Sequence, residues 1–592
     1  MKEEITKQLK TEDLEKKFAR DGSLTRKKLF EYIPAMVITN LSTLLLLSVD
    51  GLVLGNFVGN DALAAVNIFY PATLFIGVVS QLVGVGASSA ISTCMGRNDL
   101  ETLSRLKKAV TFLLIIMGVA ITVIQIPVVY GIIATYNLDS EINTMTWQYA
   151  IGIMLATPLG LVSTVGVYQL QILGKMKVLM WLTFTEGVAN LVLDLLFVAV
   201  FHMGPMGASM GTACANLIRC TLTLIYLLRK TDFFKFGKVK VQKADIKDIL
   251  SSGLPDASNS LVLALRNYVI MIIIVDLFGP AGGVIKGVCG FCFDLVNVVT
   301  SGIQGAMRPL MGLLSGADDR EGIRTLMKQG IITMSAALAV MTMVIELVPE
   351  FFYHLHGVDN IPDGGVLSVR FYALFFGVKA INTIFRLYFT NRKDSKFSTT
   401  ITILGNCTLP AFAWILSVTL DAPFVWLSYL FTEVVIFIVD IFRYIGWLKK
   451  DKNEETPDSC RLYLTVEPQD AIEASRLIRR YAEEKGMPIR IMNRISLCME
   501  EMVFYAAKSQ KNDKIRIQIE ILFTGDNARF TMLDDGECIA LNEDSETKER
   551  ITDNYGLIKR SANTVQYQYI LDMNYSILTF VPKTKTGVGG IV

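Results

Sequence analysis

The sequence predicts an α-helical membrane protein with a soluble α/β domain at its C-terminal end. Of the 592 residues, 52% are hydrophobic and only 19% are charged, and the mean hydropathy is +0.44. An ordinary soluble protein is less apolar than this. Apolar runs of about 20 residues, the length that crosses a bilayer, recur up to residue 448 and then stop. The chain therefore divides into a membrane part and a polar tail.

Twelve apolar runs are long enough to form transmembrane helices. We expect them near 29–55, 64–92, 109–135, 145–172, 177–201, 206–229, 248–278, 284–313, 328–352, 364–391, 398–419 and 424–448. Every second loop is rich in Lys and Arg, as in 96–108 and 229–247, and the loops between them carry neither. Because basic loops stay on the cytoplasmic side, we expect a multi-pass protein of the cell membrane with both termini in the cytoplasm.

An internal repeat divides the membrane part. The segment GASSAISTCMGRNDLETLSRLKKAV begins at Gly86, and GAMRPLMGLLSGADDREGIRTLMKQGI begins at Gly305. The two segments lie six predicted helices apart, so both halves have the same orientation. This arrangement predicts two parallel six-helix repeats with a central cleft between them.

Composition changes give the domain boundaries. Residues 1–28 are highly charged with both signs mixed, which is typical of a cytoplasmic amphipathic segment and not of a signal peptide. We expect the following parts: 1–28 N-terminal segment, 29–229 first bundle, 230–247 linker, 248–448 second bundle, 449–460 linker and 461–592 tail domain.

Polar side chains lie on one face of the fifth predicted helix. Glu186, Asn190 and Asp194 are four residues apart each time, so they share a helix face. A carboxylate inside a bilayer is costly, and it is usually kept where it faces a cavity, a partner or an ion path. Glu186 either extends a proton path or lies near the inner interface.

Three of the polar residues are expected at one depth in the membrane. Counted from the helix ends, Asp50, Asp194 and Thr212 lie about 9–12 Å below the outer surface, at about 1.5 Å per residue. Two carboxylates with amide and hydroxyl oxygens suit either a hard cation or a shared proton. The alternative is structural hydrogen bonding, which is the commoner role of an isolated Asn190 or Thr212.

The second half carries deep charges of both signs. Asp294 and Lys379 are the deepest, and they either pair with each other or line the central cleft. Basic residues in a cleft repel an organic cation, so they leave open an anionic or zwitterionic substrate.

The membrane part contains SVDGLVLGNFVGNDALAAVN, NLVLDLLF followed by GPMGASMGTACAN, and the two repeat segments. In these features it resembles the MATE family of multidrug and toxic compound extrusion antiporters. It covers about 30–448. In similar prokaryotic members a cation site lies in the first bundle, and the matching positions are Asp50, Asn190, Asp194 and Thr212.

The tail reads as one small α/β domain. RLYLTV alternates as a strand, two amphipathic helices follow, and KIRIQIEILFTG and ARFTMLDDG predict a hairpin. A short helix near 555–564 precedes the strands QYQYILD and YSILTFV, which we expect to join at about Met573 and Asn574. These elements predict a two-layer sandwich of strands and helices.

This order of elements resembles a histidine-kinase-type ATPase domain in its anti-sigma-factor form. The positions that match the family's nucleotide-binding motifs are Glu501, Asp534, Gly536 and Gly556. The Asn that holds Mg²⁺ in the family is replaced by Tyr505, and the second Gly of the Asp box by Cys538. Since the metal ligand is missing, we expect a catalytically inactive domain for which ATP is not a cofactor.

Together these patterns predict a transporter and not an enzyme. We expect a secondary active antiporter for small amphipathic molecules, driven by Na⁺ or H⁺, with a regulatory tail that binds a cytoplasmic protein. The alternatives are a lipid-linked precursor flippase, a transceptor that signals through the tail, and a signalling ATPase.

The net charge of +2 gives no sign of nucleic-acid binding. Beyond Na⁺ at the coupling site we expect no metal, and the lone pair Cys289 and Cys292 is better explained by helix packing.

Overall fold

The computed structural model describes residues 14–97, 99–136, 140–230, 239–279, 281–355, 358, 360–453, 459–508, 515–538 and 556–582. Its contacts divide the chain into two compact units. The membrane unit comprises Leu29–Asp318 and Leu326–Tyr444, and the tail unit comprises Met1–Lys28, Asp319–Thr325 and Ile445–Val592. The tail unit therefore includes residues that precede the first membrane helix and a short loop in mid-chain.

The described residues contain twelve helices long and apolar enough to cross a membrane, which confirms the expected number. The first half of the chain forms α2 (Ser23–Phe57), α3 (Asn60–Ser80), the π-helical η1 (Gln81–Val85), α4 (Gly86–Arg97), α5 (Leu100–Tyr136), α6 (Ser140–Ile172), α7 (Met176–Asp194), the π-helical η2 (Leu195–Val200) and α8 (Gly204–Lys230).

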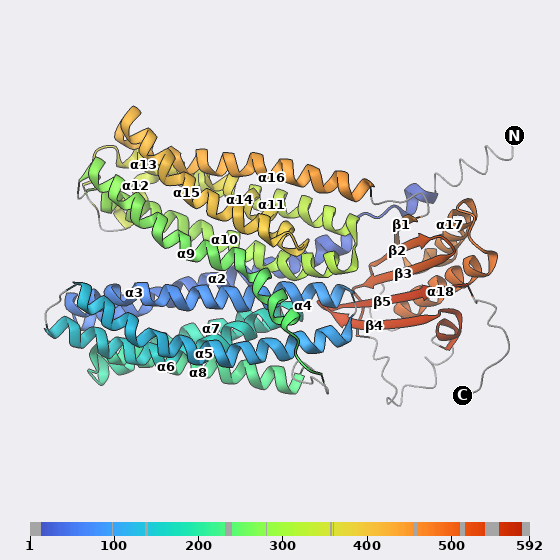
Figure 1. Ribbon diagram of the computed structural model, residues 1–592, viewed down its shortest axis with the longest axis horizontal. Helices are drawn as coiled ribbons and strands as arrows, with labels where there is room; N and C mark the ends of the chain where they lie inside the picture. Colours follow the sequence, from blue (N-terminus) through green and yellow to red (C-terminus); the bar gives the residue numbers. More distant parts are fainter. Residues whose placement is uncertain are drawn as a thin grey trace. The chain divides into compact units, whose positions relative to one another are not determined.

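The second half forms α9 (Lys243–Phe278), α10 (Ala281–Ala317), α11 (Arg320–Leu347), α12 (Pro349–Leu355), α13 (Gly365–Ala373), α14 (Phe376–Asn391), α15 (Ser395–Thr419), the 3₁₀ turn η3 (Ala422–Trp426) and α16 (Leu427–Asn453). Within the membrane unit, α6 packs against α3, α5 and α8, and α9 packs against α15. In Figure 1 the helices of the first half, drawn from blue to green, lie side by side, as do those of the second half.

The two halves meet through α4, which packs against α9 and α10. Glycines bring the backbones together there. A Cβ added at Gly96 would overlap the backbone of Leu313, and one at Gly316 would overlap the backbone of Thr93. Both positions lie near the C-terminal ends of α4 and α10. The halves are therefore closed against each other at that end of the bundle.

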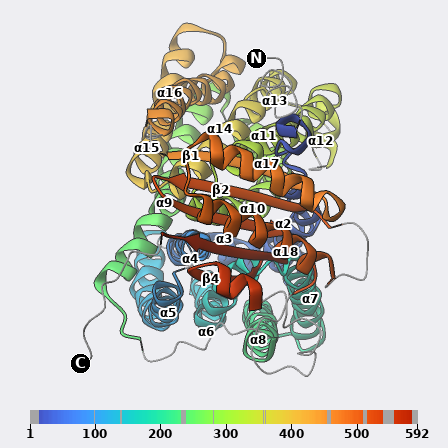
Figure 2. The ribbon, with the colours of Figure 1, turned by 90° about the vertical axis from the view of Figure 1, so that its right-hand side faces the viewer.

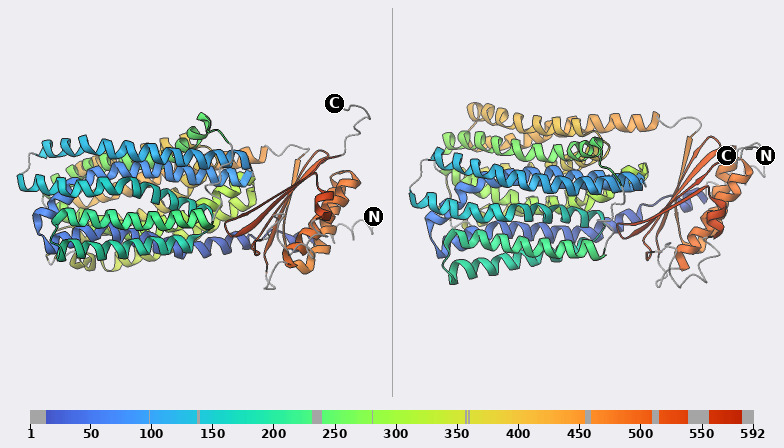
Figure 3. Two further views of the ribbon diagram at one scale, coloured as in Figure 1. Left: turned by 90° about the horizontal axis from the view of Figure 1, so that it is seen from below. Right: turned by 60° about the horizontal axis from the view of Figure 1, so that its bottom comes forward.

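The tail unit contains a five-stranded antiparallel sheet in the order β1-β2-β3-β5-β4. The strands are β1 (Ser459–Val466), β2 (Ile517–Thr524), β3 (Asn527–Asp534), β4 (Thr564–Ile570) and β5 (Met573–Phe580), with the helices α17 (Ala471–Glu484) and α18 (Ile489–Lys508). Both helices share a hydrophobic core with the strands, and Figures 2 and 3 show them beside the sheet.

One turn in this sheet differs from the expectation. The chain reverses between β4 and β5 at Leu571 and Asp572, and not at Met573 and Asn574, which already pair within the sheet. Leu571 and Asp572 both have positive φ, at 55° and 52°. This is the backbone of a two-residue type I′ hairpin, whose twist matches that of the flanking strands. Asp tolerates positive φ but Leu rarely adopts it, so the residue types at these two positions did not mark the turn.

The N-terminal segment contributes to the core of the tail unit. Phe18 is only 2% exposed and belongs to the same hydrophobic cluster as the strands and helices. Ala19 forms an isolated antiparallel bridge with Leu464 of β1. Residues from the two ends of the chain therefore build one core.

Candidate functional site

Four polar residues from three helices meet inside the first half of the membrane unit. Asp50 lies on α2, Asn190 and Asp194 on α7, and Thr212 on α8. Asn190 and Asp194 are completely buried, and Asp50 is 8% exposed. The structure thus brings together the four residues that the sequence singled out. We call them the acidic cluster.

Hydrogen bonds join the members of the acidic cluster. The Thr212 hydroxyl lies 3.2 Å from both carboxylate oxygens of Asp50. The Asn190 amide donates to Thr212 Oγ1 over 3.1 Å and to Asp194 Oδ1 over 3.3 Å. The carboxyl groups of Asp50 and Asp194 lie close enough to interact electrostatically with each other. Two carboxyl groups in contact favour a state in which one of them carries a proton, or in which a cation lies between them.

Two acceptor atoms of the cluster remain available among the described contacts. Asp194 Oδ2 and Asn190 Oδ1 are buried without a hydrogen-bond partner there. Buried acceptors without a donor are costly, and a proton or a small cation would satisfy them. Carboxylate, amide and hydroxyl oxygens are the ligands that a hard cation prefers. Among the described residues, no group of three or more His, Cys, Asp or Glu side chains forms a transition-metal site.

Two further residues shape the cluster, and the sequence reasoning missed both. The Tyr149 hydroxyl on α6 donates to Asp50 Oδ2 over 2.7 Å, and Tyr149 is buried. Gly211 on α8 lies against Asp194, so a Cβ at that position would overlap the carboxylate. The glycine lets α8 approach α7 closely. Its place in GPMGASMGT, one residue before Thr212, was the only available signal.

Glu186 lies apart from the acidic cluster although it shares a helix face with Asp194. Its carboxylate forms an ion pair with Arg219 of α8, and its side chain is 1% exposed. Arg219 also donates to the Ser163 hydroxyl on α6. The ion pair links α7 with α8, and Arg219 was not considered in the sequence reasoning.

The two deep charges of the second half, Asp294 and Lys379, do not pair with each other, so that alternative was wrong. Lys379 lies 3.4 Å from the carboxylate of Glu433 on α16 and not beside Asp294. Lys286 is the basic group that interacts electrostatically with Asp294. Glu433 was overlooked because it lies in the last apolar run, 54 residues beyond Lys379.

Comparison with known proteins decides the family. Residues 35–196 and 257–415, together more than half of the chain, match the MatE family. The chain belongs to the MatE family. MatE proteins are transporters and not enzymes, and they span the membrane many times. The match begins in α2 and ends in α15, so it includes α7 and most of the acidic cluster.

Relatives of known role are distant. The multidrug export protein MepA of Staphylococcus haemolyticus is 22% identical over 303 residues, which is 50% of this chain and 66% of that protein. MepA of Staphylococcus saprophyticus is 21% identical over 294 residues, covering 49% of this chain and 64% of that protein. The chain thus spans 64 to 66% of the length of these MatE relatives.

Solved structures share the fold. A multidrug resistance MATE transporter in an outward-facing conformation has a TM-score of 0.67 at 21% identity, covering 72% of this chain and 97% of that chain. A transporter from Pyrococcus furiosus, described by the reversed polarity of its binding pocket, has a TM-score of 0.66 at 21% identity, covering 73% of this chain and 97% of that chain.

The tail lies outside the MatE match, and two of its four motif positions, Asp534 and Gly536, are engaged in internal contacts. The Asp534 carboxylate accepts hydrogen bonds from the Asn574 amide over 2.7 Å and from the Gly536 backbone over 3.0 Å. Burial raises the pKa of Asp534 to about 6, and the hydrogen bonds oppose that rise. Glu501 is partly buried on α18, and Gly556 lies at the start of the last described helix.

A buried ion pair in the tail unit holds two distant segments together. The Arg20 guanidinium binds both carboxylate oxygens of Asp319, over 2.8 and 2.7 Å, and also donates to Gln518 of β2. Both charged side chains are less than 5% exposed. Asp319 also accepts from the Gly322 backbone over 2.8 Å, which caps the start of α11. We call this contact the Arg20 tie.

Proposed function

We propose that the chain is a secondary active efflux transporter for small amphipathic molecules, driven by Na⁺ or H⁺ bound at the acidic cluster. The supporting observation is the meeting of Asp50 and Asp194 in a buried site with unsatisfied acceptor oxygens. The names of the MepA relatives, multidrug export proteins, favour efflux of several compounds.

The cluster can couple an ion to transport because it joins three helices. Asp50 on α2 and Asp194 on α7 repel each other when both are ionised, and a proton or cation removes that repulsion. An ion shifts a conformational equilibrium only by its differential affinity for the two states. We propose that binding at the cluster draws α2, α7 and α8 together and so favours one arrangement of the halves.

The decisive experiment is substrate exchange by the full-length protein in liposomes under an imposed Na⁺ or pH gradient. Asp194→Asn should lose ion-driven efflux of a small amphipathic dye by at least about ten-fold, since a lost charge-assisted contact costs about 1.5–3 kcal/mol. Asp61→Asn, which changes an exposed acid on α3, is the control and should transport normally. Wild-type transport by Asp194→Asn would reject the coupling assignment.

We further propose that the protein lies in the cell membrane with both termini in the cytoplasm, as the basic loops indicate. In that orientation the glycine contacts between α4 and α10 close the cytoplasmic end of the bundle. The described conformation is then closed toward the cytoplasm, as an alternating-access cycle requires of one of its states.

For the tail we propose a regulatory role in a catalytically inactive domain of ATPase-like, two-layer form that binds a cytoplasmic protein. Tyr505 is buried where that family places its metal-binding Asn, and Asp534 is buried in internal hydrogen bonds. ATP hydrolysis by the full-length protein should therefore stay at background, and turnover abolished by Glu501→Gln would contradict this view. Support for regulation comes from the Arg20 tie, which connects the chain just before α2 with the chain just before α11.

A further inference from the structure

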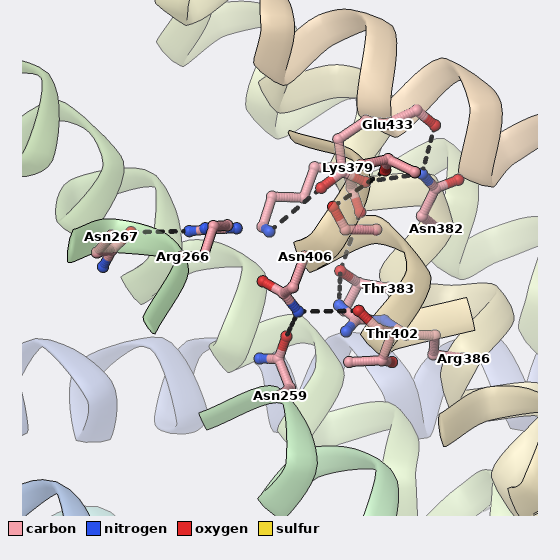
Figure 4. A network of polar contacts seen from close by, with 12 residues as sticks. Asn259, Arg266, Asn267, Lys379, Asn382, Thr383, Arg386, Thr402, Asn406 and Glu433 are labelled. Carbon is pink, nitrogen blue, oxygen red and sulfur yellow. Dashed lines mark hydrogen bonds and ion pairs between the residues drawn. The ribbon is translucent and has the colours of Figure 1, made fainter. Parts of the chain in front are cut away.

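A small polar cavity lies in the second half, away from the acidic cluster. It has a volume of about 30 Å³ and lies between α9, α14, α15 and α16. Arg266, Lys379 and Arg386 line it with a single acid, Glu433. Figure 4 shows these side chains around the amides of Asn259 and Asn406. Three basic groups around one cavity inside a membrane are costly, and such groups usually mark a binding site or a path.

Arg266 and Arg386 each have N–H donors that form no hydrogen bond among the described contacts. Among the described contacts, Arg266 donates only to the neighbouring Asn267, over 3.2 Å, and its Nε is buried without a partner. Arg386 donates to Thr383 over 3.3 Å. A guanidinium has five N–H donors in a planar fork. Most of that capacity therefore remains open beside the cavity.

Lys379 is the basic group that is already paired. Its ammonium lies 3.4 Å from Glu433, whose other carboxylate oxygen accepts from Asn382 over 2.8 Å. Asp440 on α16 is the second acid close to Arg386. The cavity itself is lined by three basic groups and one acid, so at least one positive charge is left over even with Asp440 ionised nearby. A single bound anion would neutralise the site.

We infer that this cavity binds the carboxylate group of a transported substrate. The geometry of a guanidinium matches a carboxylate through two parallel N–H···O bonds. One water molecule needs about 10–15 Å³ of cavity volume, so a cavity of about 30 Å³ admits a small head group and not a bulky one. Arg266 also lies 5.8 Å from the ring of Tyr429, and this cation–π contact helps to hold the guanidinium in place. This inference rests on the proposed transport function and names a class of its substrate.

The test is ligand binding by the purified full-length protein, followed by thermal stabilisation. Benzoate, benzylammonium and benzyl alcohol share one ring and differ only in charge. Benzoate should stabilise the protein at concentrations at least about ten-fold lower than benzyl alcohol, and benzylammonium should not stabilise it. Equal effects of benzoate and benzylammonium would overturn the inference.

Variants assign the binding to this cavity. Arg266→Gln and Arg386→Gln should each weaken benzoate binding about ten-fold or more, and Arg386→Lys should fall between that variant and wild type because it keeps charge without the fork. Arg443→Gln, which changes an exposed arginine paired with Asp394, is the control. The cavity would be ruled out as the benzoate site if both Gln variants bound benzoate as wild type does and had wild-type melting temperatures without ligand.

Two further experiments distinguish a lipid carboxylate from that of a soluble acid, and the carboxylate site from the proposed ion-coupling site. Competition by phosphatidylserine in nanodiscs, lost in Arg266→Gln, would identify a lipid head group, and its absence would identify a soluble acid. Asp194→Asn should lose ion-driven transport and still bind benzoate. Loss of both benzoate binding and ion-driven benzoate efflux by the arginine variants would uphold the cavity as a substrate site, and unchanged benzoate efflux would remove it.

Discussion

At the scale of single residues, the acidic cluster depends on donors that keep two carboxyl groups in place. Asp50 receives hydrogen bonds from Tyr149 and Thr212, whereas Asp194 Oδ2 receives none among the described contacts. The two acids are therefore unequal. We expect Asp50 to stay anchored while Asp194 takes up and releases the ion.

Tyr149→Phe tests this inequality. The change removes one hydrogen bond to a charged group, worth about 1.5–3 kcal/mol, without a change of ring volume. If the driving ion is H⁺, the ionised carboxylate loses a stabilising donor, so the proton concentration that gives half-maximal dye efflux should fall about ten-fold in liposome assays. Tyr130→Phe, an exposed tyrosine on α5, should leave it unchanged. An unaltered ion requirement in Tyr149→Phe would show that the phenol does not support the site.

Glu520 should give the tail unit a pH-dependent stability. Burial raises the pKa of Glu520 to about 8 from 4.5, with Asp319 adding to the rise and Arg461 opposing it. Between these values the folded state keeps a proton that the unfolded state releases, so the free energy of unfolding falls as pH rises. The loss is complete once pH exceeds the folded-state pKa.

Glu520→Gln places a neutral side chain at this position at every pH. It should remove most of the decrease in the free energy of unfolding as pH rises. Hydrogen exchange of β2 and β3 in the full-length protein, measured from about pH 7 to pH 9 and corrected for intrinsic rates, reports this change in stability. This range lies above the pKa of Asp534, which is about 6. Glu483→Gln, at an exposed position of α17, serves as the control. The same pH dependence in Glu520→Gln and wild type would contradict the assignment.

At the scale of helices, closure of the membrane unit depends on glycine contacts between α4 and α10. Gly96→Ala places a methyl group against the backbone of Leu313, and overpacking of this kind costs about 1–3 kcal/mol. The closed end should therefore open more often. Spin labels at the exposed positions 101 and 328 should show a population at longer distance. Gly290→Ala on α10 meets no neighbour and should leave the distances as they are.

The N-terminal segment should be an element of the tail fold and not a loose extension. Phe18→Ala removes a buried ring and should destabilise the tail unit by about 3–5 kcal/mol, which limited proteolysis of the tail would detect. Lys17→Ala alters the adjacent residue, whose ion pairs with Asp470 and Glu473 are exposed, and should have little effect. Equal protease resistance of Phe18→Ala and wild type would place the segment outside the fold.

At the scale of the whole molecule, the Arg20 tie connects the starts of helices from opposite halves. Arg20 precedes α2, and Asp319 precedes α11. If the halves separate at the end where these helices begin, the tie has to break. Removal of one partner of a buried ion pair costs about 3–5 kcal/mol, so Arg20→Met should shift the population toward the separated state and change the rate of dye efflux.

Spin labels at positions 101 and 328 measure this shift in the same way. Lys27→Met removes an ion pair with Asp535 whose lysine is 43% exposed, and it should have a much smaller effect. Unchanged label distances in Arg20→Met would show that the tie fastens the tail without influencing the halves.

Sequence patterns predicted the features that depend on local spacing. The apolar runs gave the twelve spans, and the four-residue spacing of Asn190 and Asp194 placed them on one helix face. Contacts between distant segments left no such pattern. Tyr149 is one of many membrane tyrosines, and its bond to Asp50 depends on how α6 packs. The partner of Lys379 and the place of Phe18 in the tail core likewise depend on tertiary packing between segments far apart in the chain.

The Arg20 tie has a thermodynamic consequence for the acidic cluster. If the tie is intact in only one arrangement of the halves, and the driving ion prefers one arrangement, the two are linked equilibria. A cytoplasmic protein that strengthens or breaks the tie then changes the affinity of the ion at Asp50 and Asp194, and the ion changes the affinity of that protein by the same factor. The affinity of the tail for its partner would in this way depend on the ion gradient across the membrane, and the partner would regulate the flux that the gradient drives.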